Sequence, residues 1–214
     1  MKKTVYSICL LVVVGVLIAI LGLGRRARVE PEIETLLKKA VLLIADVGTV
    51  INKDGTIDTG CLQEYENNLS EIFKDDSKEA QKYLETKRQV YESFNNHSDA
   101  VLENAITDFD VRTYDEKGDA AKVVFDYTLI QKYIPYFKEK GLYVASMSAG
   151  KETVECELEK QEDGNWKIVQ TKSVHYESGT LEQMNITDTD YTKLFKTRQE
   201  ACDYLNKIDV ISFR

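Results

Sequence analysis

Histidine and cysteine are scarce in this chain of 214 residues, and each scarcity excludes some kinds of functional site. The two histidines, His97 and His175, are too few for a multi-histidine metal site or for two histidine-based catalytic dyads. Beyond the first 28 residues the cysteines are odd in number and lack metal-site spacing, so at most one disulfide can form; they are Cys61, Cys156 and Cys202. We expect buried free thiols, and we expect neither a metal nor another cofactor.

Basic residues are in the minority once the first 28 residues are set aside. Five of the 28 lysines and arginines fall in that stretch, so the other residues carry 23 basic against 36 acidic side chains, a balance of −13. Nucleic-acid binding depends on basic side chains that neutralise phosphates, so this balance argues against a nucleic-acid partner. Roughly two-fifths of the remaining residues are still apolar, which suits one ordinary domain with a core rather than a disordered chain.

Long apolar runs are absent except at the start, where residues 4–24 are almost entirely apolar. At about 1.5 Å per residue, a helix of this length spans roughly the 30 Å hydrocarbon core of a bilayer. A cleaved signal peptide is the alternative, but its apolar region is normally about 7 to 15 residues and ends at a small-residue cleavage site. Here Arg25 and Arg26 follow directly, so we expect an uncleaved anchor within residues 1–28.

Charge alone does not orient this anchor, because Lys2 and Lys3 on one side nearly balance the arginines on the other. The short basic tail followed by an apolar run resembles a signal-anchor, which leaves the tail in the cytoplasm and exports the rest. We therefore expect a single-pass protein of the cell membrane with the bulk of the chain extracytoplasmic.

Apolar residues at helical spacing predict three helices after the anchor. Pro31 is placed to begin the first, which ends before a turn at residues 52–55. A second is expected over residues 62–73, and a third begins at the cap residue Ser77 and ends near Asn95.

Beyond Ser98 the apolar period changes from 3.6 to 2, which predicts antiparallel strands. We expect a hairpin around a turn at residues 115–119, with Phe109, Val111 and Thr113 on one face and a bulge near residues 105–107. A short helical turn or a crossover is expected at residues 133–140. A second hairpin is expected over residues 142–160 with its turn at residues 149–150, followed by a closing strand over residues 166–176 with one face inward.

The second hairpin shows its pattern most clearly, because Val154, Cys156 and Leu158 alternate with glutamates, so these three side chains should face the core. A Thr-x-x-Glu capping box at residues 197–200 opens a final helix. Together these elements predict an α+β fold in which three helices pack on a curved antiparallel sheet, with an extra C-terminal helix.

Two acidic stretches invite a metal-binding interpretation, and both have a simpler one. Residues 52–58 share the centre of a calcium loop, but Val50 and Cys61 stand where its first carboxylate and its final glutamate are required. The glutamates at positions 155, 157 and 159 are typical of the solvated face of a strand. We therefore interpret the first stretch as a turn and the second as surface.

Two segments resemble the hairpin and final strand of the nuclear transport factor 2-like, or cystatin-like, superfamily. They are residues 111–123 (VRTYDEKGDAAKV) and 158–169 (LEKQEDGNWKIV), and the resemblance covers about residues 30 to 178. It implies a cystatin-like extracytoplasmic domain over residues 29–180, followed by a C-terminal helical extension over residues 181–214. The layout is similar to inner-membrane assembly factors of type IV secretion and conjugation systems. The superfamily includes enzymes, ligand binders and assembly domains, so the resemblance alone assigns no activity.

Aromatic residues on the expected inner faces are the candidate site. They are Phe109, Phe125, Tyr127 and Trp166, with His175 on the closing strand. They either fill the core or line a ligand cavity on the concave face of the sheet. If Trp166 lines the core, strand alternation turns His175 toward solvent.

Two functional hypotheses follow. In the first, residues 4–24 hold a non-catalytic exported domain at the membrane, where it binds a protein partner or forms a homo-oligomer, such as an envelope-spanning complex. In the second, the domain binds a small molecule, or acts as a modest enzyme, with Tyr127, Trp166 and His175 near the ligand.

Overall fold

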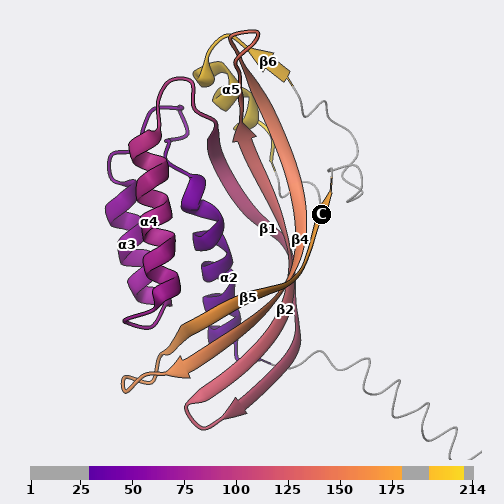
Figure 1. Cartoon of the computed structure of the whole chain (residues 1–214). Helices are drawn as coiled ribbons and strands as arrows, with labels where there is room; N and C mark the ends of the chain where they lie inside the picture. The colour runs from indigo at the N-terminus through magenta and orange to yellow at the C-terminus, as the bar shows by residue number, and fades with distance from the viewer. Residues whose placement is uncertain (1–28, 180–192, 210–214) are drawn as a thin grey trace, which may run out of the picture.

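Three helices form one layer of the molecule (Figure 1). The computed structural model describes residues 29–179 and 193–209, so the expected anchor lies outside the described residues. Helix α2 spans Pro31–Ala45 with its proline in the first turn, and a short 3₁₀ helix η1, Asp46–Gly48, continues it. Helices α3, Cys61–Ile72, and α4, Lys78–Ser93, confirm the other two predicted helices. Within the described ranges no helix is both long and apolar enough to cross a bilayer.

The second layer is a six-stranded antiparallel sheet. Its strands are β1 Ala100–Lys117, β2 Ala120–Ile134, β3 Tyr136–Phe137, β4 Leu142–Lys160, β5 Trp166–Gly179 and β6 Lys193–Phe195. A last helix, α5, Arg198–Leu205, begins at the predicted capping box, in which Thr197 and Glu200 cap each other's backbone N–H groups. The helices and the antiparallel sheet confirm the α+β class.

Strand β4 is the central strand of the sheet, because every other strand except β1 pairs with it. Strand β5 pairs with β4 from Lys160 to Ala149, and β6 pairs with it from Ala145 to Tyr143. Both run antiparallel to β4. Strands β5 and β6 therefore occupy the same side of β4, one after the other.

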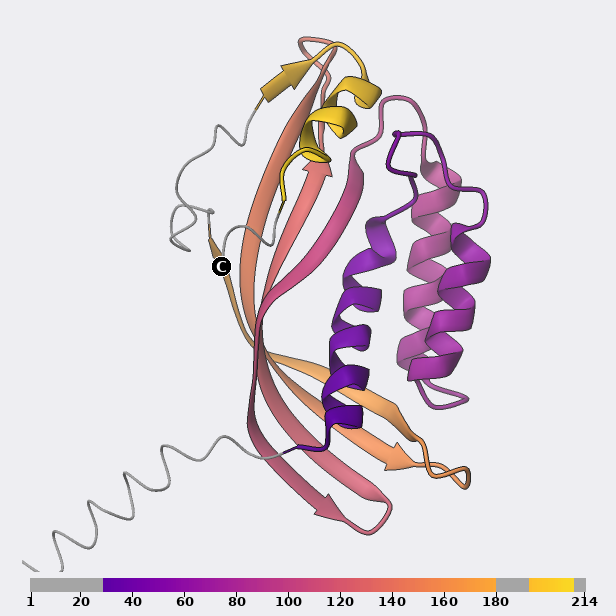
Figure 2. The same cartoon turned by 180° about the vertical axis from the view of Figure 1, so that it is seen from behind.

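The buried side of the sheet changes halfway along its long strands. In β2 the fully buried side chains are odd-numbered up to Phe125 and even-numbered from Ile130, and β4 shows the same change between Ala149 and Val154. Successive side chains point to opposite faces, so the core moves from one face to the other. Because β2 and β4 pair here without a register shift, the change comes from strand twist, visible as the narrow waist in Figures 1 and 2.

Two hydrophobic clusters result. The first lies between α2, α3 and α4 and the face of the sheet that carries Phe125 and Val154, which we call the Phe125 face. The second includes α5 and the opposite face around Ile130 and Ala149. Val154, Cys156 and Leu158 are 7%, 0% and 2% exposed, which confirms the predicted register of β4. Cys61, Cys156 and Cys202 are buried free thiols, as predicted.

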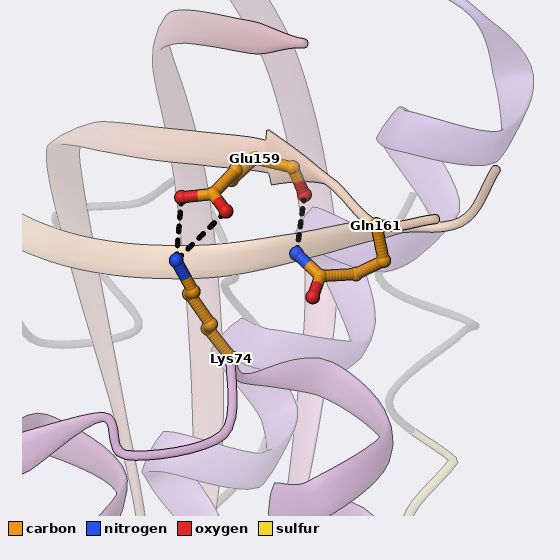
Figure 3. Close-up of polar contacts among 3 residues, drawn as sticks. All are labelled: Lys74, Glu159 and Gln161. Carbon is orange, nitrogen blue, oxygen red and sulfur yellow. Dashed lines mark hydrogen bonds and ion pairs between the residues drawn. The ribbon is translucent and has the colours of Figure 1, made fainter. Parts of the chain in front are cut away.

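The loop after α3 is fastened to the far end of β4 and β5 (Figure 3). Lys74 Nζ lies 2.7 Å from both carboxylate oxygens of Glu159, and Gln161 Nε2 donates to the Glu159 carbonyl at 3.3 Å. The Lys74 N–H donates to the Ile168 carbonyl at 2.8 Å, next to a parallel bridge between Phe73 and Ile168. The outer edge of β5 is thus covered at its beginning.

The predicted turn at residues 149–150 is wrong, because β4 runs through it without a break. Gly150 pairs with Leu129 on β2 and with Ser178 on β5. An interior glycine is compatible with a strand where another group approaches the backbone closely, and here the Tyr176 ring occupies that space. The long neighbouring strands determine the conformation at Gly150.

Of the two alternatives expected for residues 133–140, the helical turn is wrong. Strand β2 continues to Ile134, and β3 turns back through Gly141, whose φ is +65°, into β4. Pro135 lies between the strands, where a missing backbone donor costs no ladder hydrogen bond.

Two remaining differences concern single positions of the strands. A register shift between Ile106 and Asp108 confirms the predicted bulge, but another between Val111 and Thr113 leaves Thr113 exposed rather than inward. In β5, Trp166 and Ile168 are buried as expected. The two later register shifts cancel, so Tyr176 lies on the same face as Trp166, but it is 61% exposed because it lies where the buried side of the sheet changes.

Candidate functional site

A row of register partners crosses four strands on the Phe125 face, close to the point where the buried side of the sheet changes. Phe109 of β1 pairs with Tyr127 of β2, Tyr127 pairs with Glu152 of β4, and Glu152 pairs with Tyr176 of β5. Directly paired side chains on one face of a sheet lie in contact distance of each other. The row therefore places one carboxylate between two phenols.

A hollow of about 350 Å³ opens beside this row. Its lining consists of aromatic, small and polar residues of β2, β4 and β5: Tyr127, Leu129, Gln131, Ser148, Ala149, Gly150, Glu152, Tyr176 and Ser178. A Cβ at Gly150 would lie 3.0 Å from the hydroxyl of Tyr176, so the bare glycine lets this ring lie against the strand. This volume is at the lower end of ligand pockets.

The carboxylate of Glu152 is the charged group of the hollow. The hydroxyl of Tyr127 donates a hydrogen bond to Glu152 Oε2, while Oε1 accepts none from the described residues. Burial raises the pKa of the Tyr127 phenol, and the hydrogen bond to Glu152 and its negative charge raise it further. The site therefore presents a carboxylate oxygen without a donor among the described residues, and it can receive a positively charged or hydrogen-bond-donating group.

A buried polar network borders the hollow. Gln131 Nε2 donates to Asn104 Oδ1 at 3.0 Å, and Asn104 Nδ2 donates to Asp46 Oδ1 at 2.7 Å. Lys87, only 3% exposed, donates to the carbonyls of Asp46 and Thr49 at the end of η1. Burial raises the pKa of Asp46 and lowers the pKa of Lys87. The charges here serve mainly to join α4 to η1 and the sheet.

The later part of β5 forms the second feature of the site. From Lys172 to Ser178 the side chains are exposed, and Val174 and Tyr176 are 57% and 61% exposed. The backbone N–H of Thr171 donates to Glu79 Oε2 at 2.8 Å, and beyond it no described strand or helix pairs with the outer edge of β5. This segment runs along the margin of the sheet away from α3 and α4 in both views (Figures 1 and 2).

The predicted site residues fall into separate places. Phe109 stacks on Phe125 with ring centroids 5.1 Å apart, and Phe125 lies 6.2 Å from Tyr127. Phe125 is 2% exposed and packs in the core, whereas Tyr127 lines the hollow.

The other two lie elsewhere in the molecule. Trp166 is buried at the register of Lys160, the far end of β4 from Glu152. His175 is exposed and pairs with Thr153, on the opposite face of the sheet from Tyr127. The structure thus brings together the two phenylalanines and Tyr127.

Sequence reasoning missed Glu152, Gly150 and the surface role of Tyr176. Glu152 lies on the same face as Val154 because β4 is one continuous strand, and the turn predicted at residues 149–150 concealed this relationship. Tyr176 lies on the same face as Trp166, but it pairs with Glu152, where the buried side of the sheet changes, so its ring is at the surface. The glycine in an otherwise alternating segment was the available signal, since an interior strand glycine marks close approach of another group.

Comparison with known proteins gives a likeness in structure and none in sequence. No family model matches the chain, and no curated protein matches it. Among solved structures, the chain is similar to the intermembrane-space region of the chloroplast protein ARC6, with a TM-score of 0.47 and 11% identity. The match covers 68% of this chain and 97% of that one.

Proposed function

We propose that the chain is a membrane-anchored, extracytoplasmic, non-catalytic domain that binds proteins through the later part of β5. An unpaired strand edge presents backbone donors and acceptors that readily pair with another strand. Val174 and Tyr176 add exposed apolar surface at the same place. The observation that supports the proposal is this later stretch of β5, with which no other described strand or helix pairs along its outer edge, next to a beginning that Lys74 and Glu79 cover.

The anchor and the boundaries belong to the same proposal. Residues 4–24 supply the anchor, residues 29–180 a cystatin-like domain and residues 181–214 an extension, with everything after the anchor outside the cytoplasm. The resemblance of residues 111–123 and 158–169 supports the cystatin-like assignment. Protease added to intact spheroplasts should digest the domain; protection until lysis would reverse the orientation.

Crosslinking in intact membranes tests the binding role. A chemical crosslinker should trap a specific neighbour on the parent chain, and Val174→Asp should abolish this product because a charge on the edge disfavours strand pairing. Ile57→Asp is the matched control, since Ile57 is an exposed apolar residue (40%) far along the chain from β5. A parent without a neighbour, or equal loss in both variants, would overturn the proposal.

The hollow favours a second function, recognition of a small cation. Glu152 offers a carboxylate oxygen, and the rings of Tyr127 and Tyr176 offer faces that attract cations. Tetramethylammonium and spermidine should bind the parent in calorimetric titration, and Glu152→Gln should remove the binding. Glu157→Gln, on the other face of the same strand, should leave it intact. Equal binding by both variants would exclude the hollow as the site.

A further inference from the structure

The direction of the backbone groups along β5 defines what can pair with its outer edge. The Thr171 N–H points away from β4, because it donates to Glu79. In an antiparallel strand, the backbone N–H and C=O groups of every second residue point to the same side. The register shift at Val174 inserts one extra residue, so the next outward residue after Ser173 comes three positions later instead of two. The outward positions after Thr171 are therefore Ser173, Tyr176 and Ser178.

The side chains of the segment sort onto two faces in the same way. Ser173 and Tyr176 pair with Val154 and Glu152, so they lie on the Phe125 face. Lys172 and Glu177 pair with the opposite-face residues Glu155 and Lys151, and both are exposed. The segment thus carries a positive charge near its beginning and a negative charge near its end, on one face.

We propose that a second copy of this chain pairs antiparallel with residues 171–178 of β5, about a two-fold axis between Val174 and His175. This inference rests on the proposed function and names its partner. Ser173 then lies opposite Tyr176 of the second copy, and the outward backbone groups of both residues meet. Lys172 lies opposite Glu177 of the second copy, on the same face, and symmetry makes this ion pair twice.

Neighbouring registers fit less well. An axis through His175 places Lys172 opposite Ser178 of the second copy, which lies on the other face of the sheet. It also places the outward Ser173 opposite Glu177, whose backbone groups point to β4. With the axis between Val174 and His175, paired side chains lie on the same face, outward backbone groups meet outward backbone groups, and opposite charges are paired. The bulges at Val174 of the two copies then lie beside each other across the axis.

Charge reversal tests this register on the full chain in detergent micelles. Two populations with donor and acceptor fluorophores on C-terminal tags report association by energy transfer. Lys172→Glu and Glu177→Lys should each weaken association roughly tenfold, because two attractive pairs become repulsive. The double variant K172E/E177K should restore it, which also shows that the substitutions leave the fold intact.

Mixing the two single variants gives the decisive outcome. Their mixed dimer has two attractive pairs, so it should form in preference to either homodimer. Self-association that is unaffected by both reversals would overturn this register and leave the proposed function standing. A monomeric chain that still crosslinks to a different protein would overturn the second copy as partner. A monomeric chain without any crosslinked neighbour would overturn both.

Discussion

Gly150 and Tyr176 share one space: a Cβ built on Gly150 would lie 3.0 Å from the Tyr176 hydroxyl and 3.1 Å from Cε2 of its ring. The two residues lie on adjacent strands, and their contact forms one wall of the hollow beside Glu152. The contact links the interior of the sheet to its exposed margin. It also explains why a glycine is tolerated inside the longest strand.

Gly150→Ala should change the free energy of unfolding by no more than about 1 kcal/mol. The Tyr176 ring is mostly exposed and can move aside, and alanine suits an extended backbone better than glycine does. Gly118→Ala is the control, because Gly118 has open space around it but a φ of +64°, and it should cost about 1 kcal/mol or more. Urea unfolding of residues 29–214 measures both; a larger loss at position 150 would mean that the Tyr176 ring is fixed.

Leu158→Ala should lower the free energy of unfolding by about 2 to 5 kcal/mol, because the side chain is 2% exposed and its loss leaves a cavity. Glu157→Ala should remain within about 0.5 kcal/mol of the parent, since this exposed residue makes only a 3.9 Å ion pair with Lys122. The same urea titration compares them. Equal effects would contradict the register of β4.

Lys87→Met should cost about 1 to 3 kcal/mol, because it leaves the carbonyls of Asp46 and Thr49 buried without their donor. Lys82→Met makes the same change on the exposed side of the same helix and should be nearly neutral. If both variants unfolded at the parent's urea concentration, the network would contribute nothing to joining α4 and η1.

Alkaline pH should destabilise the domain through its buried tyrosines. Burial raises the pKa of Tyr83 to about 12 and raises the pKa values of Tyr65 and Tyr127 as well. Because these pKa values are raised in the folded state, the stability they contribute is present below pH 10 and is lost as the pH rises toward 12.

Ultraviolet absorbance of ionised phenol follows this titration. A late fraction should ionise together with loss of the circular dichroism of the sheet, and Tyr83→Phe should reduce it. Complete ionisation near pH 10 with the sheet intact would contradict the burial of these rings.

Local patterns predicted the helices and the register of β4 because each depends on neighbouring residues alone. Pro31, Ser77 and the capping box at Thr197 mark helix starts, and Val154, Cys156 and Leu158 alternate within one strand. The hollow depends on non-local features. Strand twist changes the buried face between Phe125 and Ile130, and no residue type signals it.

Glycine is common in turns, so the sequence predicts a turn at Gly150 where the structure has a continuous strand. The pairing of Glu152 with Tyr127 depends on that continuous strand and is therefore not predictable from the local pattern. Two register shifts in β5, at Val169 and Val174, together keep Tyr176 on the face of Trp166, and single-residue insertions in a ladder leave little trace in sequence. The structure confirms that Trp166 and Phe125 lie on inner faces. The distance between them along the sheet depends on how β4 pairs with β2 and β5, which the local sequence does not show.

A photo-crosslinking amino acid at Val174 of the full chain, in intact membranes, tests binding through β5 most directly. Illumination should join Val174 to a second copy within residues 171–178, as mapped by mass spectrometry of the product. The same amino acid at Gln89, on the exposed side of α4, should give little product. Absence of a product from position 174, or an equal yield from position 89, would contradict the proposal that the chain meets its partner at this edge.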